Sequence, residues 1–114
     1  MKTNDLEERV IDFTVFIIDI VEHIKKTYAG NYYGNQLIRS SGGASLNFGE
    51  AQGIITNKDF IFKVGLAVKE LKESRNSLKI INYINEGDEI KRALLLKEVE
   101  ELVAIASKMI INKK

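Results

Sequence analysis

The side chains that most often do chemistry in enzymes are scarce in this sequence of 114 residues. It has no cysteine and a single histidine, His23, which excludes thiolate nucleophiles, disulfides and cysteine-ligated metals and leaves most histidine-based sites without a partner. A carboxylate-bridged pair of metal ions would need Glu-x-x-His on two helices, and His23 instead follows Glu22 directly. The sequence also has no Gly-Lys pair for a phosphate-binding loop. We therefore expect no enzyme, no cofactor and no metal site, and we expect His23 on the solvated edge of a helix.

Polar residues in the middle of the chain recur with the spacing of one helix face. They are Gln36, Ser40, Gly43, Asn47 and Glu50, separated by steps of four and three residues. If this face meets a neighbouring helix, its amide and carboxylate groups need partners, because a buried unpaired polar group costs several kcal/mol. The nearest partners in the sequence are Arg39, Glu70 and Glu73. We expect a hydrogen-bonded network that fixes the register of two helices, and general acid–base chemistry by Glu50 is the alternative.

Basic residues gather further along the chain, where Lys69, Lys72 and Lys79 fall on one stripe of a predicted helix. The whole chain has 17 Lys and Arg residues against 16 Asp and Glu residues, so its net charge of +1 does not favour a nucleic-acid or membrane partner. A solvated helix face accounts for the lysine stripe. The alternative is a surface that binds the phosphates of RNA or DNA, with weak affinity because one subunit offers few contacts.

No stretch near the start resembles a signal peptide or a membrane span. The apolar residues that follow the opening MKTNDLEER are interrupted by Asp12 and Asp19, so they form neither an uncharged signal core nor a span of about 20 residues. With 45% apolar residues in a short chain, we expect residues 1–114 to form one domain. We expect this domain to be cytoplasmic and to have no membrane partner.

The first element that must position these residues is a helix near the start of the chain. Apolar residues recur at steps of four and three from Leu6 onward, which predicts a helix that ends near Thr27. Asn4 and Glu7 have the spacing of a capping box at its beginning.

Two further helices are predicted in the second half of the chain. Thr56 can cap a helix over residues 58–83, whose apolar stripe again keeps the four-three spacing. Gly87 can adopt a positive φ in the turn that follows, and Asp88 can cap the last helix. Asp88 and Arg92 are also spaced for an ion pair worth about a few tenths of a kcal/mol.

The segment between residues 33 and 53 is the least regular. Its spacing predicts a helix, whereas Gly42 and Gly43 favour a loop, because each glycine inside a helix costs about 1 kcal/mol relative to alanine. We favour the helix, since the small residues at positions 40–45 would let a neighbouring helix approach closely. Four helices with short connections predict an all-α fold, an up-down-up-down antiparallel four-helix bundle.

The first and last predicted helices have more apolar residues than one bundle face uses. The surplus residues are Ile11, Val15, Phe16, Ile18 and Val21 in the first helix and Leu94, Leu96, Val103, Ile110 and Ile111 in the last. A second buried face is therefore expected, most simply against another copy of the chain. A wide apolar stripe in a tightly packed monomer is the alternative.

Three motifs between residues 36 and 78 add a resemblance to a known family. They are Q-L-I-R-S at 36–40, N-F-G-E-A at 47–51 and K-D-F-I-F-K-V-G-L-A-V-K-E at 58–70, followed by Glu73. In order and spacing they resemble the bacterial proteins encoded in 23S rRNA intervening sequences. The residues at the family positions are Gln36, Leu37, Arg39, Asn47, Glu50, Asp59, Phe60, Ala67 and Glu73. The first and last helices match that family only in pattern.

The resemblance implies a non-enzymatic homo-oligomer that acts as a scaffold or adaptor. Members of known architecture are four-helix bundles that assemble as homopentamers. Their relatives include the accessory variability protein of diversity-generating retroelements, which binds nucleic acid and a reverse transcriptase. The implied partners are therefore other copies of the chain, RNA or DNA, and a protein such as a reverse transcriptase. Direct nucleic-acid binding through Lys69, Lys72 and Lys79 is the alternative function, which the near-neutral net charge weakens, because the relatives that bind nucleic acid are basic.

Overall fold

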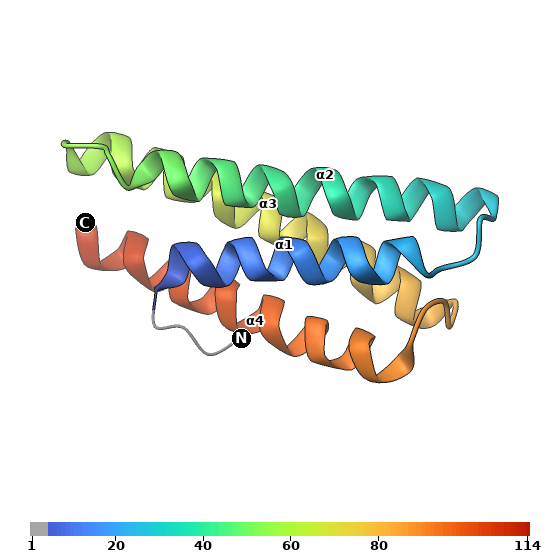
Figure 1. The fold of residues 1–114 in the computed structure, drawn as a ribbon. Coiled ribbons are helices and arrows are strands. Elements are labelled where there is room, and N and C mark those ends of the chain that lie inside the picture. Colours follow the sequence, from blue (N-terminus) through green and yellow to red (C-terminus); the bar gives the residue numbers. More distant parts are fainter. Residues whose placement is uncertain (1–4) are drawn as a thin grey trace.

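The computed structural model describes residues 5–114, which form four helices in an antiparallel bundle (Figure 1). The helices are α1 (Leu6–Glu22), α2 (Tyr28–Ala51), α3 (Asn57–Tyr83) and α4 (Glu89–Lys113). Helix α1 packs against α2 and α4, and α3 packs against the same two helices on the other side. This arrangement confirms the predicted all-α, up-down-up-down four-helix bundle. Gly42 and Gly43 lie inside α2, so the helix prediction for that segment is also confirmed.

Side-chain caps begin the helices. The hydroxyl of Thr56 accepts a hydrogen bond from the backbone N–H of Asp59, and the Asp88 carboxylate accepts one from Lys91, as the sequence predicts. Gly87 has a φ of 78° in the turn between α3 and α4, a conformation that suits glycine. Asn4, the predicted cap of α1, lies outside the described residues.

The boundary between α1 and α2 differs from the prediction. Helix α1 ends at Glu22, five residues before Thr27, and Thr27 instead caps α2 by accepting a hydrogen bond from the N–H of Gly30. Because Thr27 already belongs to the start of the next helix, the residues before it must form the connection. Ile24 remains buried in that connection, so the apolar pattern continues past the end of the helix.

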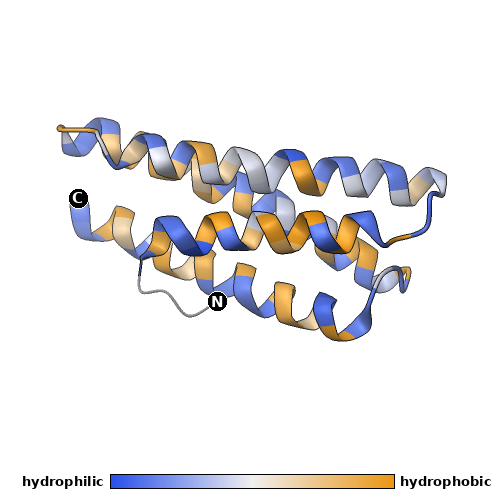
Figure 2. Ribbon diagram, viewed as in Figure 1, coloured by the Kyte–Doolittle hydropathy of each residue, from blue (hydrophilic) through white to orange (hydrophobic). Residues whose placement is uncertain are grey.

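The core lies along the bundle axis, where apolar residues from all four helices meet (Figure 2). Its largest fully buried side chains include Phe13, Ile17, Ile20, Leu37, Phe48, Leu71, Leu78, Ile81 and Leu102. Val21 and Val103 are buried in this core, and Leu96 and Ile110 pack against its edge. The prediction that these four residues belong to a second apolar face is therefore wrong. None of the helices in residues 5–114 is both long and apolar enough to cross a membrane.

The turn from α3 to α4 is organised by a buried arginine. Arg92 is only 3% exposed, and its guanidinium donates to the side-chain oxygens of Asn82 and Asn85 and to the carbonyl oxygens of Glu86 and Gly87, at 2.6–2.9 Å. The predicted ion pair with Asp88 is therefore wrong. The guanidinium is directed instead to Asn82 in the last turn of α3 and to the connection that follows it, close to the C-terminal end of a helix, where the helix dipole favours a cation.

Candidate functional site

The polar residues predicted on α2 lie along its contact with α3, and Arg39 is the centre of the contact. Its guanidinium donates to the carboxylate of Glu73 at 2.8 Å and to that of Glu70 at 3.4 Å. It also donates to the amide oxygen of Gln36, one turn earlier on α2. The structure thus brings four of the predicted residues together, Gln36, Arg39, Glu70 and Glu73, and they join α2 to α3.

The two carboxylates of this cluster differ in their electrostatics. The hydrogen bond from Arg39 lowers the pKa of Glu73. The pKa of Glu70 is raised, chiefly because that carboxyl is mostly buried, and its hydrogen bond with Glu73 adds to the effect. One cation therefore pairs with two acids, and the surroundings as a whole lower the pKa of Glu73 and raise that of Glu70. This arrangement suits a structural ion pair between α2 and α3.

Small residues allow α2 and α3 to approach closely beside Arg39. The hydroxyls of Ser40 and Ser74 are fully buried and hydrogen-bonded to each other at 2.7 Å. The Glu70 carboxylate lies over the backbone of Gly43, where a Cβ atom on that residue would overlap it. By contrast, a Cβ atom on Gly42 would meet no atom within 4 Å. Gly43 therefore has a packing role that Gly42 lacks.

Asn47 and Glu50 do not join this network, which corrects the prediction for these two residues. The amide of Asn47 donates to the carbonyl oxygen of Gly43 on its own helix, at 3.0 Å. The carboxylate of Glu50 is exposed and accepts a hydrogen bond from Lys63 of α3 at 2.6 Å. Glu50 lies at the solvated edge of the interface, so its charge needs no buried partner, and its exposure gives no support to acid–base chemistry.

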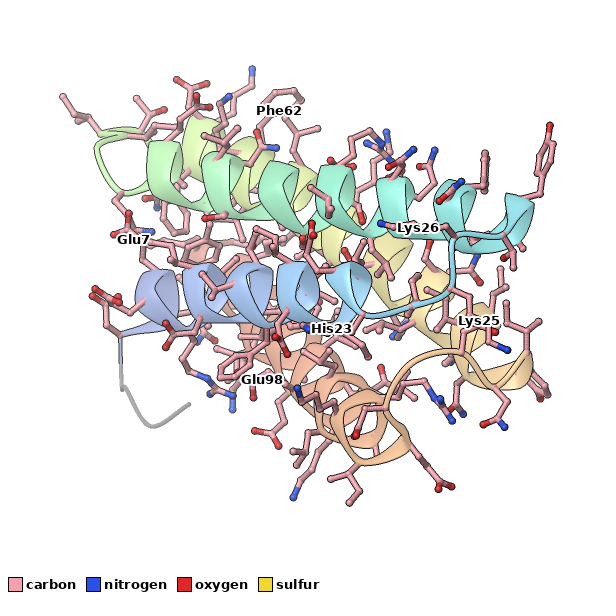
Figure 3. All side chains as sticks on the ribbon, turned by 45° about the vertical axis from the view of Figure 1, so that its right-hand side comes forward. Glu7, His23, Lys25, Lys26, Phe62 and Glu98 are labelled. Atoms are coloured by element: carbon pink, nitrogen blue, oxygen red, sulfur yellow. The ribbon has the colours of Figure 1, made fainter. Side chains whose placement is uncertain are left out.

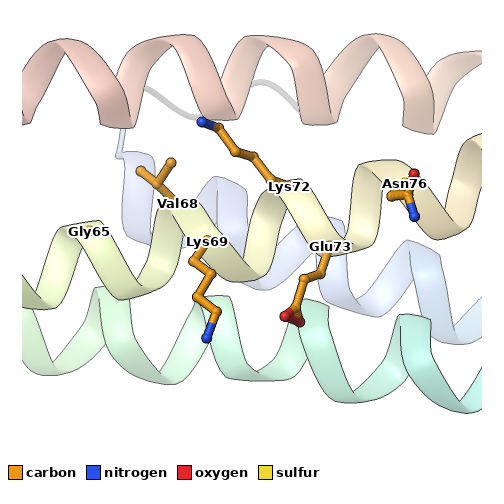
Figure 4. A pocket seen from close by; sticks show the side chains of 6 residues that line it. All are labelled: Gly65, Val68, Lys69, Lys72, Glu73 and Asn76. Atoms are coloured by element: carbon orange, nitrogen blue, oxygen red, sulfur yellow. The ribbon is translucent and has the colours of Figure 1, made fainter.

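The lysine stripe lies on the outer face of α3, beside the Arg39 cluster. Lys69, Lys72 and Lys79 are exposed, and none of them forms an ion pair within the described part of the chain. On this outer face Lys69 extends toward α2, as Glu73 does, and Lys72 extends toward α4 (Figure 4). Between them is an open hollow of about 550 Å³, lined by Gly65, Val68, Lys69, Lys72, Glu73 and Asn76.

Two aromatic residues share the lysine stripe and are absent from the predicted site. Phe62 is 65% exposed and projects away from the bundle (Figure 3), and Tyr83 is 90% exposed. Both have the four-three spacing of the lysines on α3, so the sequence holds the signal. A prediction based only on charged residues does not include Phe62 and Tyr83.

A third group of polar residues, also absent from the prediction, joins α1 to α4. Arg9 donates to the carboxylates of Glu98 and Glu101 at 2.7 and 3.2 Å, and Glu98 is buried. Its hydrogen bond with Glu98 is the main reason that the pKa of Arg9 is raised. Lys91 of α4 pairs with Asp19 at 2.9 Å. Residues 89 positions apart in the chain, such as Arg9 and Glu98, leave no local spacing signal.

His23 is exposed at the C-terminal end of α1, as predicted (Figure 3). Its ring Nδ1 is 2.7 Å from the carbonyl oxygen of Asp19, one turn earlier. Within residues 5–114, no group of three or more His, Cys, Asp and Glu side chains is arranged to hold a metal ion.

Comparison with known proteins supports the fold. No protein-family model and no curated protein matches the sequence. A solved structure from Bacteroides thetaiotaomicron, described as a protein of unknown function from the S23 ribosomal protein family, is similar with a TM-score of 0.82. The two chains are 19% identical, and the match covers 93% of this chain and 98% of the other. At this level of identity, what this chain shares with that protein is its four-helix fold.

Proposed function

We propose that this chain is a non-enzymatic helical bundle that assembles with copies of itself, as a cyclic pentamer, and acts as a scaffold or adaptor. The observation that supports the proposal is apolar surface on α1 and α4 that the bundle does not bury. The exposed large apolar side chains there are Ile11, Val15, Phe16 and Ile18 of α1 and Ile90, Leu94, Ile105 and Ile111 of α4. Exposed apolar side chains gathered on two neighbouring helices are typical of protein–protein interfaces.

The register of α1 against α4 places part of this surface at one level of the bundle. Arg9 pairs with Glu98, and Asp19 pairs with Lys91. Phe16 lies between the two paired positions of α1, and Leu94 lies between those of α4. The apolar residues of both helices can therefore contribute to one interface.

The motif resemblance extends this proposal to family and partners. The motifs on α2 and α3 and the fold shared with an S23-family protein support membership of the family encoded in 23S rRNA intervening sequences. We include in the proposal a role in an RNA-linked assembly, with a protein such as a reverse transcriptase as partner.

Light scattering coupled to size exclusion tests the assembly. We expect a mass several times the 12.9 kDa of one chain at micromolar concentration. The double variant Val15→Lys and Leu94→Lys should dissociate the assembly, whereas Leu46→Lys, on an exposed apolar residue of α2, should leave the mass unchanged. A monomer mass for the unmodified chain would rule out the proposal.

Direct nucleic-acid binding is the second candidate function. The observation that favours it is the exposed position of Lys69, Lys72 and Lys79 on one face of α3, with no ion pair in the described part of the chain. Three lysines offer few phosphate contacts, and repetition of the face around an oligomer would multiply them. The test is the affinity for structured RNA and duplex DNA at 50 to 200 mM salt, with Lys69→Glu and Lys72→Glu as variants. We expect weak binding that the variants abolish.

A further inference from the structure

The outermost residues of α3 form one continuous stripe, which we call the outer stripe. Its members, spaced by four and three residues, are Lys58, Phe62, Gly65, Lys69, Lys72, Asn76, Lys79 and Tyr83. All of them are exposed except Gly65, which is half-buried. At a rise of about 1.5 Å per residue the outer stripe is about 38 Å long. It contains four lysines and no carboxylate.

Two carboxylates beside the outer stripe, those of Glu73 and Glu100, already have arginine partners. Glu73 accepts a hydrogen bond from Arg39 of α2, and Glu100 of α4 accepts one from Arg75, each at 2.8 Å. Lys69 and Lys79 contribute only secondary effects to the lowered pKa values of these two acids. Because arginines neutralise these two acids, and Lys69, Lys72 and Lys79 form no ion pair within the described part of the chain, the charges of these three lysines remain available to an anionic ligand.

The aromatic residues set this face apart from an ordinary solvated one. Phe62 and Tyr83 are largely exposed, and about 32 Å of helix separates them, with Lys69, Lys72 and Lys79 in between. The hollow at Gly65 and Val68 has Lys69 and Lys72 on its two sides and Asn76 further along α3 (Figure 4). Gly65 has no side chain, and a Cβ atom there would meet no atom within 4 Å, so no other residue covers the helix backbone at the bottom of the hollow.

We infer that the outer stripe is a binding site for single-stranded nucleic acid, with phosphates on the lysines and bases stacked on Phe62 and Tyr83. The inference rests on the second candidate function above and names its ligand. Single-strand sites combine a positive track with aromatic rings on which bases stack, because every base has a π-face. In a duplex the bases are stacked on one another, so exposed rings beside the phosphates would have no partner. An acidic peptide would satisfy the lysines and leave both rings unused.

The test measures fluorescence anisotropy of labelled 12-nucleotide poly(U) and poly(dT), with a duplex of equal length as comparison, at 50 to 200 mM salt. The double variant Phe62→Ala and Tyr83→Ala should weaken single-strand affinity about tenfold or more, and Phe62→Trp with Tyr83→Trp should restore it. Lys69→Gln and Lys72→Gln should each reduce the salt slope by about 0.7. Lys97→Gln and Lys108→Gln, on exposed lysines of α4, are the matched charge controls and should change neither quantity. Circular dichroism checks that every variant is folded.

The outcomes separate this inference from the function on which it rests. Equal affinity for single strand and duplex, unaffected by loss of the two rings, would overturn the inference and leave phosphate binding by α3 in place. Absence of binding to every nucleic acid at 50 mM salt would overturn both. Competition by polyglutamate as effective as that by poly(U) would also overturn the inference, because it would show a site for any polyanion. Single-strand binding that depends on both rings and lysines would support it.

Discussion

Two arginines in this bundle bind their partners in opposite surroundings. Arg39 joins α2 to α3 on the surface, where its side chain is 54% exposed and its main partner is the carboxylate of Glu73. Arg92, in the first turn of α4, is buried against the turn that joins α3 to α4, and its four side-chain hydrogen bonds in the described structure go to amide and backbone oxygens. The exposed Arg39 is therefore paired with negatively charged carboxylates, whereas the hydrogen-bond acceptors of the buried Arg92 are neutral oxygen atoms.

The comparison of Arg39 with Arg92 indicates that a negatively charged partner is not what decides how much an arginine stabilises the fold. An exposed ion pair gains little, because water screens the attraction and both side chains lose conformational freedom. A buried guanidinium with its donors satisfied fixes the acceptors around it, and its removal takes four hydrogen bonds away from the turn between α3 and α4. We therefore expect Arg92 to contribute more to stability than Arg39, although Arg39 belongs to the motif that the sequence emphasises.

The largest predicted effect is at Arg92. Arg92→Ala should lower the free energy of unfolding by about 2–4 kcal/mol, because it removes four hydrogen bonds and leaves two backbone carbonyls unpaired. Arg92→Lys should cause a smaller loss, since lysine keeps the charge and three donors. Urea unfolding monitored by circular dichroism measures both. A loss for Arg92→Ala no greater than that for Arg39→Ala would break the comparison.

The next effect concerns the glycines beneath the surface site. Gly42→Ala should raise stability by up to about 1 kcal/mol, because alanine favours the helix and its methyl group would point into open space. Gly43→Ala should show no gain or a small loss, since the Glu70 carboxylate must move away from α2. Thermal unfolding of the two variants side by side gives the difference. Equal gains at both positions would show that the contact between Glu70 and Gly43 does not constrain the Arg39 cluster.

A smaller effect is expected at Arg39 itself. Arg39→Ala should cost less than about 1 kcal/mol, because the ion pair with Glu73 is largely exposed. A double-mutant cycle with Glu73→Ala isolates the coupling between the two side chains, which should decrease further in 1 M salt. A coupling energy between Arg39 and Glu73 above about 2 kcal/mol that does not change with salt would contradict this expectation, because Arg39 would then stabilise the fold as strongly as we expect Arg92 to do.

The smallest effect concerns pH. Because burial raises the pKa of Glu70, its ionised form is disfavoured in the folded state at neutral pH. Glu70→Gln should therefore leave stability unchanged at pH 7 or raise it by a few tenths of a kcal/mol. The gain should disappear as the pH falls through the raised pKa, since Glu70 is then neutral in the unmodified protein as well.

For Glu73 the expected change of stability with pH has the opposite sign. Arg39 lowers its pKa, so its contribution to stability is present above the unfolded pKa and is lost as the pH falls through the lowered one. Glu73→Gln should therefore cost stability at pH 7 and not at low pH. Unfolding curves of both variants at a series of pH values test the two signs. The same pH profile for Glu70→Gln and Glu73→Gln would contradict the assignment.

The sequence predicts those parts of the fold that depend on neighbours in the chain. Thr56 and Asp88 are recognised as caps because a cap bonds to a backbone N–H three residues away. The end of α1 is not recognised, because apolar spacing reports burial, and Ile24 is buried although the helix stops at Glu22. Spacing along a chain also cannot separate a buried helix residue from a buried residue in a connection.

The site shows the same limit. The four-three spacing places Gln36 and Arg39 on the face of α2 that meets α3, and motif order points to Glu73 as their partner. Spacing within one helix does not determine the relative axial position of α2 and α3. The pairing of Glu50 with Lys63 depends on that position, so the sequence pattern does not predict it. Arg92 is assigned to the wrong partner for a related reason, since the four acceptors of its guanidinium are backbone carbonyls and asparagine amides.

The packing order of the helices also has a consequence for folding. Within residues 5–114, α1 packs on α2, α2 on α3 and α3 on α4, and the contact of α1 with α4 closes the bundle. Consecutive helices are joined by short connections, so most interfaces form without the entropy cost of closing a long loop. The docking of α1 on α4 is the step with a large sequence separation. Folding should therefore be fast, and Arg9, Glu98 and Glu101 should acquire their contacts late in the transition.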